Sequence, residues 1–343
     1  MPAGPMSKGP HQNSPGHRGR ATPNILWRRE GKGGDELQGL DRLSVDVAEI
    51  ASCIRGQARL LEPMGEHTSL GIGGPADFFF RPADVQDVRL IMQWIRENKL
   101  AFKVVGNGTN ILVSDRGVRG AVLQLTSGCR DIRFEGPHFV APAGTKLGAA
   151  LERAAHAGLS GLEATVGIPG TVGGSIVTNA GTDTGSMGDL IEEIVVMDEE
   201  GEIFPIAREH LEYSYRYSSL MGSSLVVLEA RLRLEPDEPR EIRAKIERLR
   251  LKRAQRQPLR ARSAGSVFKN PEFIAAGKLL DRAGAKGMRI GDAQVSYKHA
   301  NFIVNRGQAT ATELRHLVEQ LQALVLRTYG IWLEPEIEFV GDW

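Results

Sequence analysis

The sequence predicts an α+β protein, and three observations lead to that prediction. Strand-like and helix-like apolar patterns alternate from about residue 76 to about residue 236. Two glycine-rich loops, at residues 106–110 and 165–181, interrupt this alternation. Beyond Pro239 the pattern changes to a long basic helix, followed by further helix and strand patterns. No internal repeat of fixed period is present, so a solenoid or propeller is not expected.

Length and composition narrow the class of protein. The 343 residues predict two or three domains at about 150 residues each. The net charge of +1 argues against a nucleic-acid partner, and no run of 18 apolar residues predicts membrane insertion. The two cysteines, Cys53 and Cys129, form no CxxC or Cys/His cluster, so we expect no disulfide framework, no metal site and a cytoplasmic location. The 40 glycines are about 12% of the chain, against a usual ~7%, which indicates backbone that approaches a ligand.

Residues 1–44 are predicted to form a disordered basic tail. The segment is rich in Gly, Pro, Ser and Arg and has too little apolar surface to build a core. We expect a solvated tail rather than a polyanion-binding arm, with ordered structure beginning near Val45.

Residues 45–125 are predicted to form a first α/β unit. The apolar segment "ADFFFR" predicts a strand, and Asp84 is a candidate N-cap for the helix that follows. The helix has one apolar face, and the segments "FKVVG" and "ILVSD" are two further strands joined by the turn "NGTN". The residues expected on the helix face are Val85, Val88, Ile91 and Ile95.

Residues 126–236 are predicted to form a second unit. A strand from His138 to Ala141 precedes a helix that Thr145 is expected to cap and Gly158 to end. The segment "IEEIVVMDEEGEIFPIA" is a hairpin pattern with its turn at Glu200 and Gly201, and "SSLVVLEARLRLEP" is a further strand. The expected helix face is Leu147, Ala150, Leu151 and Ala154.

Residues 237–343 are predicted to form a third unit. Its first helix, "REIRAKIERLRLKRAQRQP", is amphipathic and basic. Its arginines can contact phosphates, but we favour a solvated face, with Ile242, Ile246, Leu249 and Leu251 turned inward. Thr310 and Glu313 match a capping box that opens a second helix, and "EIEFVG" is a closing strand. The second helix is expected to bury Leu314, Leu317, Leu321 and Leu324.

The two glycine-rich loops are the main binding candidates. The first is not a Rossmann or Walker A loop, because Ile111 stands where the third glycine belongs and no Gly-Lys-Ser/Thr follows. The second has five glycines in 17 residues with apolar residues between them. Either loop alone is compatible with a tight turn that binds nothing. Together they favour a dinucleotide whose diphosphate lies between two small domains. The candidate cofactor-binding residues are Gly106, Asn107, Gly108, Thr109, Asn110, Thr165, Gly167, Gly170, Thr171, Gly173 and Gly174.

Several motifs in order resemble one family. The motifs are "HTSLGIGGPADFFF", "VVGNGTNILVSD", "GLEATVGIPGTVGGSIVTNAG", "YSYRYSSL", "SAGSVFKNPEFIAAGKLLDRAG", "VSYKHANFIVN" and "EPEIEFVG". With these motifs in order over about residues 64–341, the chain resembles the UDP-N-acetylenolpyruvoylglucosamine reductases, the MurB flavoenzymes of peptidoglycan synthesis, and their shorter subtype. Two stretches depart from the family: Gly71 replaces a usual basic residue, and "SIVTNAGTDTGSMGD" is looser than usual.

The resemblance implies a fold and a reaction. The fold is a two-part FAD-binding domain of the vanillyl-alcohol-oxidase (PCMH) type plus a C-terminal α+β substrate domain. The reaction is reduction of UDP-N-acetylglucosamine enolpyruvate to UDP-N-acetylmuramate by NADPH through FAD, with hydride from flavin N5, as a step in cell-wall biogenesis. NADPH and substrate alternate in one site, so no second dinucleotide motif is needed. We expect a monomer.

The resemblance also implies catalytic roles for three residues. Hydride addition to the enolpyruvyl double bond makes the adjacent carbon and its carboxylate negative, as an enediolate. Arg216 in "YRYS" and a protonated Glu336 in "EPEIEF" would stabilise that charge, and Ser266 would protonate the carbon. Outside the family pattern, the same residues would more simply be an ion-pair partner, a solvated carboxylate and a turn serine. No GxSxG elbow or neighbouring base supports Ser266 as a nucleophile.

Substrate-binding roles are predicted for Tyr215, Lys269 and Asn270, with Asn270 near the UDP diphosphate as in the family. The sequence does not choose among Tyr213, Tyr215 and Tyr217, and Lys298 and His299 are expected on an exposed strand face. Two other functions stay open: a different flavoenzyme on the same scaffold, and a non-catalytic UDP-sugar binder. The motif "SAGSVFKNP" argues against the first. The presence of all three predicted catalytic residues, the triplet Arg216, Ser266 and Glu336, argues against the second.

Overall fold

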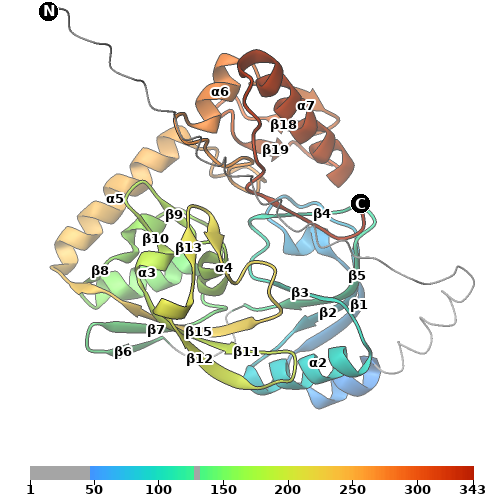
Figure 1. Ribbon diagram of the computed structural model, residues 1–343, viewed down its shortest axis with the longest axis vertical. Coiled ribbons are helices and arrows are strands. Elements are labelled where there is room, and N and C mark those ends of the chain that lie inside the picture. The colour runs from blue at the N-terminus through green and yellow to red at the C-terminus, as the bar shows by residue number, and fades with distance from the viewer. Residues whose placement is uncertain (1–46, 127–131) are drawn as a thin grey trace, which may run out of the picture. The chain divides into compact units, whose positions relative to one another are not determined.

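The computed structural model describes residues 47–126 and 132–343, which all fall in one compact unit (Figure 1). The predicted tail and Val45 lie outside these residues. The described elements mix helices with seven sheets, so the predicted α+β class is confirmed. None of the described helices is long and apolar enough to cross a membrane.

The first sheet has the order β1-β2-β5-β3, and three of its strands are parallel. The predicted strand "ADFFFR" lies in β2, and Asp84 caps α2 as expected, its side chain accepting the Asp87 N–H. The unforeseen strand β5 lies between β2 and β3, so these two strands are not neighbours. The bounds are β1 Gln57–Pro63, β2 Pro75–Arg81, α2 Val85–Glu97, β3 Phe102–Val105 and β5 Val118–Gln124.

The second sheet is antiparallel, with the order β12-β11-β15-β7-β6. The predicted hairpin is β11 and β12, and Gly201 in its turn has a φ of 85°. Helix α3 ends near Gly158 as expected, one residue past its C-cap Ala157 and at a φ of 70°. The bounds are β6 Arg133–Glu135, β7 His138–Pro142, α3 Leu147–His156, β11 Ile191–Met197, β12 Ile203–Ala207 and β15 Val226–Arg233.

The predicted cap of α3 is wrong. The N-cap is Lys146, and no side chain caps the helix. Thr145 instead uses its backbone in two other contacts: its N–H donates to the Pro142 carbonyl at 3.0 Å, and its carbonyl accepts the Val172 N–H at 2.9 Å. The residue therefore joins α3 to the second glycine-rich loop rather than capping the helix.

Short elements connect the two sheets and carry much of the site. They are η1 Met64–His67, β4 Ile111–Val113, β8 Leu159–Ser160, η2 Leu162–Thr165, α4 Val172–Val177, β9 Gly181–Thr182, β10 Gly185–Ser186, η3 Met187–Asp189, η4 Arg208–His210, β13 Tyr213–Ser214, β14 Tyr217–Ser218 and β16 Glu235–Pro236.

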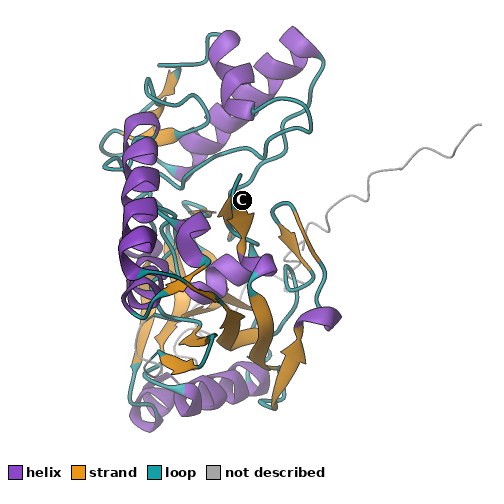
Figure 2. Ribbon diagram, turned by 90° about the vertical axis from the view of Figure 1, so that its left-hand side faces the viewer, coloured by secondary structure: helices purple, strands orange, loops and turns teal. Residues whose placement is uncertain are grey.

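The C-terminal elements begin with the long helix α5, which Figures 1 and 2 show running from the second sheet towards α6 and α7. Helix α7 opens with the predicted capping box, in which both Thr310 and Glu313 make their bonds. The bounds are α5 Pro239–Arg256, α6 Ala276–Arg282, β17 Arg289–Ile290, β18 Ala293–Val295, β19 Ile303–Asn305, α7 Ala311–Tyr329 and β20 Glu338–Val340.

The apolar face of α5 differs from the prediction at Leu251. Ile242 and Ile246 are buried and Leu249 packs against the same core, but the Leu251 side chain is 55% exposed. Leu251 follows Leu249 by two positions, which places it on the other side of a helix with 3.6 residues per turn. The residue that continues the buried stripe at a spacing of four is Arg253.

Two large cores and one small one hold these elements together. The first core joins both sheets with α2 and α3. The second fills the C-terminal unit and also takes Leu70, Ile72 and Leu112 from the first unit. In the small third core, Val340 of β20 packs against residues of the first sheet such as Phe79 and Val122. This contact is possible because β20 pairs in parallel with β4. The C-terminal strand therefore packs on the first unit.

Candidate active site

The structure brings the two glycine-rich loops together. A Cβ on Gly106 would lie 2.4 Å from the Thr171 hydroxyl oxygen, so the first loop packs directly on the second. The Thr109 hydroxyl donates to the Pro169 carbonyl at 3.1 Å, and the Asn107 amide donates to the Gly170 carbonyl at 3.4 Å. The pairing inferred from the sequence therefore has a structural counterpart.

The first loop presents its backbone rather than its side chains. The N–H groups of residues 106–110 have no acceptor among the described residues. Meanwhile Asn110 donates its side-chain amide to the Glu336 carbonyl at 3.1 Å. Gly108 has a φ of 59°, and a Cβ there would meet the His67 carbonyl oxygen at 2.0 Å, so the turn accepts only glycine. A run of free N–H groups fits the diphosphate of a dinucleotide such as FAD.

The second loop divides into packed and open residues. Thr165 donates to the Leu162 carbonyl at 2.7 Å, Thr171 caps α4, and Gly173 packs against Ala143. These three shape the loop from inside the protein. The backbone of the other three predicted residues is half-buried or exposed, at Gly167, Gly170 and Gly174.

Arg216 lies at the tip of the hairpin β13–β14. Its φ of 54° is in the left-handed region, where a residue with a Cβ is strained. Its guanidinium donates to Glu336 Oε1 at 2.5 Å, to the Gly181 carbonyl at 2.9 Å and to the Asn179 carbonyl at 3.4 Å. The strained turn thus holds the guanidinium between the second loop and the segment that carries Glu336.

Glu336 lies on a segment that runs antiparallel beside the motif "SAGSVFKNP". The Glu336 N–H donates to the Val267 carbonyl at 2.7 Å, and the Lys269 N–H donates to the Glu334 carbonyl at 2.9 Å. Burial raises the pKa of the Glu336 carboxyl, and the neighbouring Arg216 only partly opposes this. A carboxyl in this setting is protonated more readily than an ordinary glutamate.

Ser266 directly precedes Val267, the residue bonded to Glu336. It is half-buried, and its hydroxyl has no hydrogen-bond partner among the described residues. Gly265 before it has a φ of 77°, and a Cβ there would meet no atom within 4 Å, so the space beside Ser266 is open. The Ser69 hydroxyl donates to the Ser263 carbonyl at 2.7 Å and ties this loop to the first unit.

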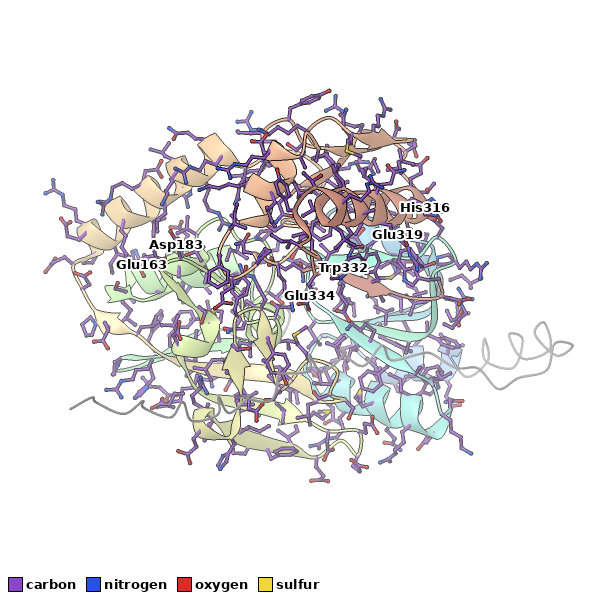
Figure 3. The ribbon with its side chains drawn as sticks, turned by 45° about the horizontal axis from the view of Figure 1, so that its top comes forward. Glu163, Asp183, His316, Glu319, Trp332 and Glu334 are labelled. Atoms are coloured by element: carbon purple, nitrogen blue, oxygen red, sulfur yellow. The ribbon has the colours of Figure 1, made fainter. Side chains whose placement is uncertain are left out.

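The three predicted substrate-binding residues lie around this triplet. The Tyr215 hydroxyl accepts the Asn270 N–H at 3.2 Å, and the Tyr215 ring lies 5.2 Å from the Arg216 guanidinium. Lys269 pairs at 2.7 Å with Glu334, which is labelled in Figure 3. The Asn270 side-chain oxygen accepts the Ala276 N–H at 3.0 Å, which leaves its amide nitrogen free to bind a ligand.

Of the remaining candidates, Tyr213 is half-buried, with a hydroxyl that no described residue hydrogen-bonds, and Tyr217 is exposed. Lys298 and His299 lie in the loop between β18 and β19, so the predicted strand face is wrong for both. Lys298 donates to the Ala254 carbonyl at 2.5 Å, which ties this loop to the end of α5. His299 accepts the Asn301 N–H at 3.2 Å, and burial lowers its pKa.

Two contributors were missed by the sequence reasoning. Asn179 has a φ of 47° and bonds to the backbone of Ser214 and Gly188, so it joins the Arg216 hairpin to the short helix η3. The other is Arg253. Its spacing of four from Leu249 in the sequence could have indicated that it lies on the buried side of α5. In addition, the Arg262 side chain lies 3.4 Å from the Cβ position of Gly71, where the family resemblance led us to expect a basic residue.

One cluster of possible metal ligands occurs within the described ranges, at Glu62, Glu66 and His67. Glu62 is bonded to both His67 and Arg59, each at 2.7 Å. The charge of the Glu62 carboxylate is therefore already balanced by Arg59. None of the contacts described above joins this cluster to Arg216, Ser266 or Glu336.

Comparison with known proteins gives consistent results. A family model described as "FAD binding domain" matches residues 76–206, and one described as "UDP-N-acetylenolpyruvoylglucosamine reductase, C-terminal domain" matches residues 257–340. The UDP-N-acetylenolpyruvoylglucosamine reductase of Moorella thermoacetica is 43% identical over 300 residues, which are 88% of this chain and 99% of the relative.

Two further proteins extend this likeness. The reductase of the same name from Caldanaerobacter subterraneus is 42% identical over 287 residues, 84% of this chain and 95% of the relative. The crystal structure of UDP-N-acetylenolpyruvylglucosamine reductase (MurB) from Thermus caldophilus superposes with a TM-score of 0.70 at 35% identity. That superposition covers 84% of this chain and 99% of the other.

Proposed function

Because this chain belongs to the UDP-N-acetylenolpyruvoylglucosamine reductase family, and is an FAD-binding oxidoreductase of peptidoglycan synthesis, we propose that it reduces UDP-N-acetylglucosamine enolpyruvate to UDP-N-acetylmuramate with NADPH. The observation that carries this proposal is the contact between Arg216 and Glu336 beside the Ser266 loop. A cytoplasmic location and a monomeric state remain predictions.

Binding of FAD is assigned to the two packed glycine loops. The free N–H groups of residues 106–110 would hold the diphosphate, and the backbone at Gly170 and Gly174 would admit the cofactor closely. When bound there, FAD would take a hydride from NADPH and pass it to the enolpyruvyl double bond. The remaining steps are assigned to side chains of the chain itself.

Arg216 and Glu336 would bind the enolpyruvyl carboxylate between them. A planar guanidinium holds a carboxylate through two N–H groups, and this interaction strengthens as negative charge accumulates there. The carboxylate would also draw Arg216 away from Glu336, which leaves Glu336 with less support for its charged form. A protonated Glu336 then donates a hydrogen bond to the growing charge, which its raised pKa favours.

Ser266 would give the proton that completes the reduction. Its hydroxyl has no competing partner among the described residues, and open space lies beside Gly265. A carbanion is basic enough to take a hydroxyl proton. The two rival functions are disfavoured for the same reason: neither an oxidase nor a passive UDP-sugar binder needs this donor next to a carboxylate clamp.

A stopped-flow experiment without oxygen tests the proposal. NADPH should bleach the flavin absorbance of the purified protein, and added UDP-N-acetylglucosamine enolpyruvate should restore it rapidly. An oxidase would recover its colour with oxygen and not with the enolpyruvyl ether. A flavin that stays reduced after the ether is added contradicts the proposed function, and a colourless protein that binds UDP-sugars would indicate the passive binder.

A further inference from the structure

Arg253 lies where α5 meets the second glycine-rich loop. It follows Ile242, Ile246 and Leu249 on the buried stripe of the helix. Its Nη1 donates to the Val166 carbonyl, and its Nε donates to Gln257 Oε1 at 3.2 Å. Its Cδ lies 3.3 Å from the Cβ position of Gly167, so the side chain covers the start of the loop.

The charge of Arg253 is not neutralised by any described residue. Both of its hydrogen-bond partners are neutral, and its Nη2 has no acceptor in the described part of the chain. Other basic residues of α5 differ in this respect. Arg250, one turn earlier, pairs with Glu152 at 2.9 Å and Glu247 at 3.4 Å, and Lys245 pairs with Glu163 at 3.0 Å.

An uncompensated cation in this position is costly. Burial lowers the pKa of Arg253, and the positive charge of Arg216 lowers it further, so the two guanidinium groups are near enough to repel each other. Glu336 is bonded to Arg216, but burial raises the pKa of this carboxyl, so it is protonated more readily than an ordinary glutamate and neutralises Arg216 less fully. A partly buried charge needs a partner of opposite sign. A bound anion would satisfy both arginines.

We propose that Arg253 is a binding residue of this site and that its guanidinium holds phosphate oxygens of a nucleotide diphosphate. A guanidinium with unused N–H groups matches phosphate geometry, and the glycine loop beside it leaves room for a ligand at backbone distance. This inference rests on the proposed function, because FAD and the UDP-linked substrate both carry a diphosphate. Helix α5 would then supply, through Arg253, a ligand-binding side chain between the second glycine-rich loop and Arg216.

Three full-length variants separate charge from packing. Arg253→Gln keeps an amide donor for the Val166 carbonyl but loses the charge, whereas Arg253→Lys keeps the charge. Arg250→Gln is the matched control, since that residue is paired and exposed on the same helix. The dissociation constant of FAD is measured from free-flavin fluorescence on serial dilution of the holoprotein, and the KM for the enolpyruvyl substrate from steady-state rates.

Arg253→Gln should weaken one of the two affinities by about tenfold or more, as expected for one charge-assisted hydrogen bond. A raised FAD constant identifies the cofactor diphosphate, and a raised substrate KM with unchanged FAD binding identifies the UDP diphosphate. The affected constant should also depend less steeply on salt than in the wild type. Arg253→Lys keeps the charge but not the planar guanidinium, so it should lose less affinity than Arg253→Gln, and Arg250→Gln should match the wild type.

Two results would overturn the proposal. One is unchanged FAD and substrate affinity in Arg253→Gln. The other is equal loss in the Gln and Lys variants with an unaltered salt dependence, which would show that Arg253 only packs against the loop. A wild-type protein that binds FAD but does not turn over the enolpyruvyl ether would defeat the proposed function, while the FAD measurement would still decide the role of Arg253.

Discussion

The Ser266 hydroxyl is the most specific chemical assignment in this protein. Replacing it with alanine should leave flavin reduction by NADPH within about twofold of the wild type, because that step needs no proton from Ser266. Turnover of the enolpyruvyl ether should fall by about 10²- to 10⁴-fold, the usual contribution of a positioned general acid. Rapid mixing of each half-reaction measures the two steps separately.

Ser266→Cys is the companion variant, since a thiol keeps a proton donor at nearly the same place. It should retain more turnover than Ser266→Ala. Equal loss of both half-reactions in the alanine variant would show that Ser266 shapes the site instead of protonating the substrate.

Glu336 gives a pH dependence whose direction follows from its environment. Burial raises its pKa above the ordinary 4.5, so turnover should decline as pH rises through the raised value and the proton donor is lost. Glu336→Gln cannot lose a proton and should remove that limb of the profile, although its maximum rate should be lower. The measurement is kcat against pH for both proteins. A wild-type limb that persists in the Gln variant would assign the titration to another group.

The same carboxyl affects stability. The folded protein binds the Glu336 proton more tightly than the unfolded chain, so unfolding releases a proton above pH 4.5. The free energy of unfolding should therefore decrease as pH rises from 4.5 through the raised pKa. Denaturant titrations of wild type and Glu336→Gln should diverge in this window and run parallel outside it.

The hairpin β13–β14 links Arg216 to the loop that carries Ser266. Tyr215→Phe removes only the hydroxyl that accepts the Asn270 N–H, and we expect the KM for the UDP-linked substrate to rise by about three- to tenfold through misplacement of Asn270. Flavin reduction by NADPH should be unaffected. Tyr217→Phe is the control on the same hairpin, because no described residue bonds its hydroxyl. Identical behaviour of the two variants would leave Tyr215 without this role.

Local sequence patterns predicted most of the helices and strands. A few specific residues show which features such patterns could not predict. Asp84, Thr310 and Glu313 were found because a capping side chain acts within three or four residues. Thr145 was misplaced because its backbone is used by Val172, a contact that no local pattern records. Strand β5 escaped notice as the centre of the first sheet, since strand order depends on distant pairing.

The candidate site shows the same division. Motif order alone located Arg216, Ser266 and Glu336, and the structure joins the segments that carry them. Arg253 was predicted to lie on a solvated helix face. The sequence of a basic helix does not show which of its arginines lack a carboxylate partner, and only the structure shows that Arg253 is bonded to neutral groups. Asn179 likewise has no sequence motif of its own, and its left-handed backbone is visible only in three dimensions.

Contacts between distant parts of the chain determine how the whole molecule is held. The Asp115 carboxylate accepts N–H groups of Ala311 and Thr312 at 2.7 and 2.8 Å, so a residue of the first unit caps helix α7. Asp115→Ala should lower the free energy of unfolding by about 1–2 kcal/mol, the usual effect of losing a cap. Asp281→Ala, which removes an exposed ion pair with Lys286, should change it by less than about 1 kcal/mol.

Denaturant unfolding measured by fluorescence and by circular dichroism tests this. If the first and C-terminal units are held together as the contacts indicate, both probes should report one transition in wild type and in Asp115→Ala. A loss of stability no greater than that of Asp281→Ala would show that α7 does not depend on this cap.

The pairing of β20 with β4 sets an order in time as well as in space. Ile111 of β4 lies beside Glu338, which the ribosome adds 227 residues later. The first glycine-rich loop precedes β4 directly, and Asn110 in that loop contacts the carbonyl of Glu336. A nascent chain can therefore form its first sheet early, but it cannot complete the place where cofactor and substrate meet until this strand has been translated. Premature termination before Glu336 would yield a chain that lacks this closure, and so an inactive protein rather than a partly competent one.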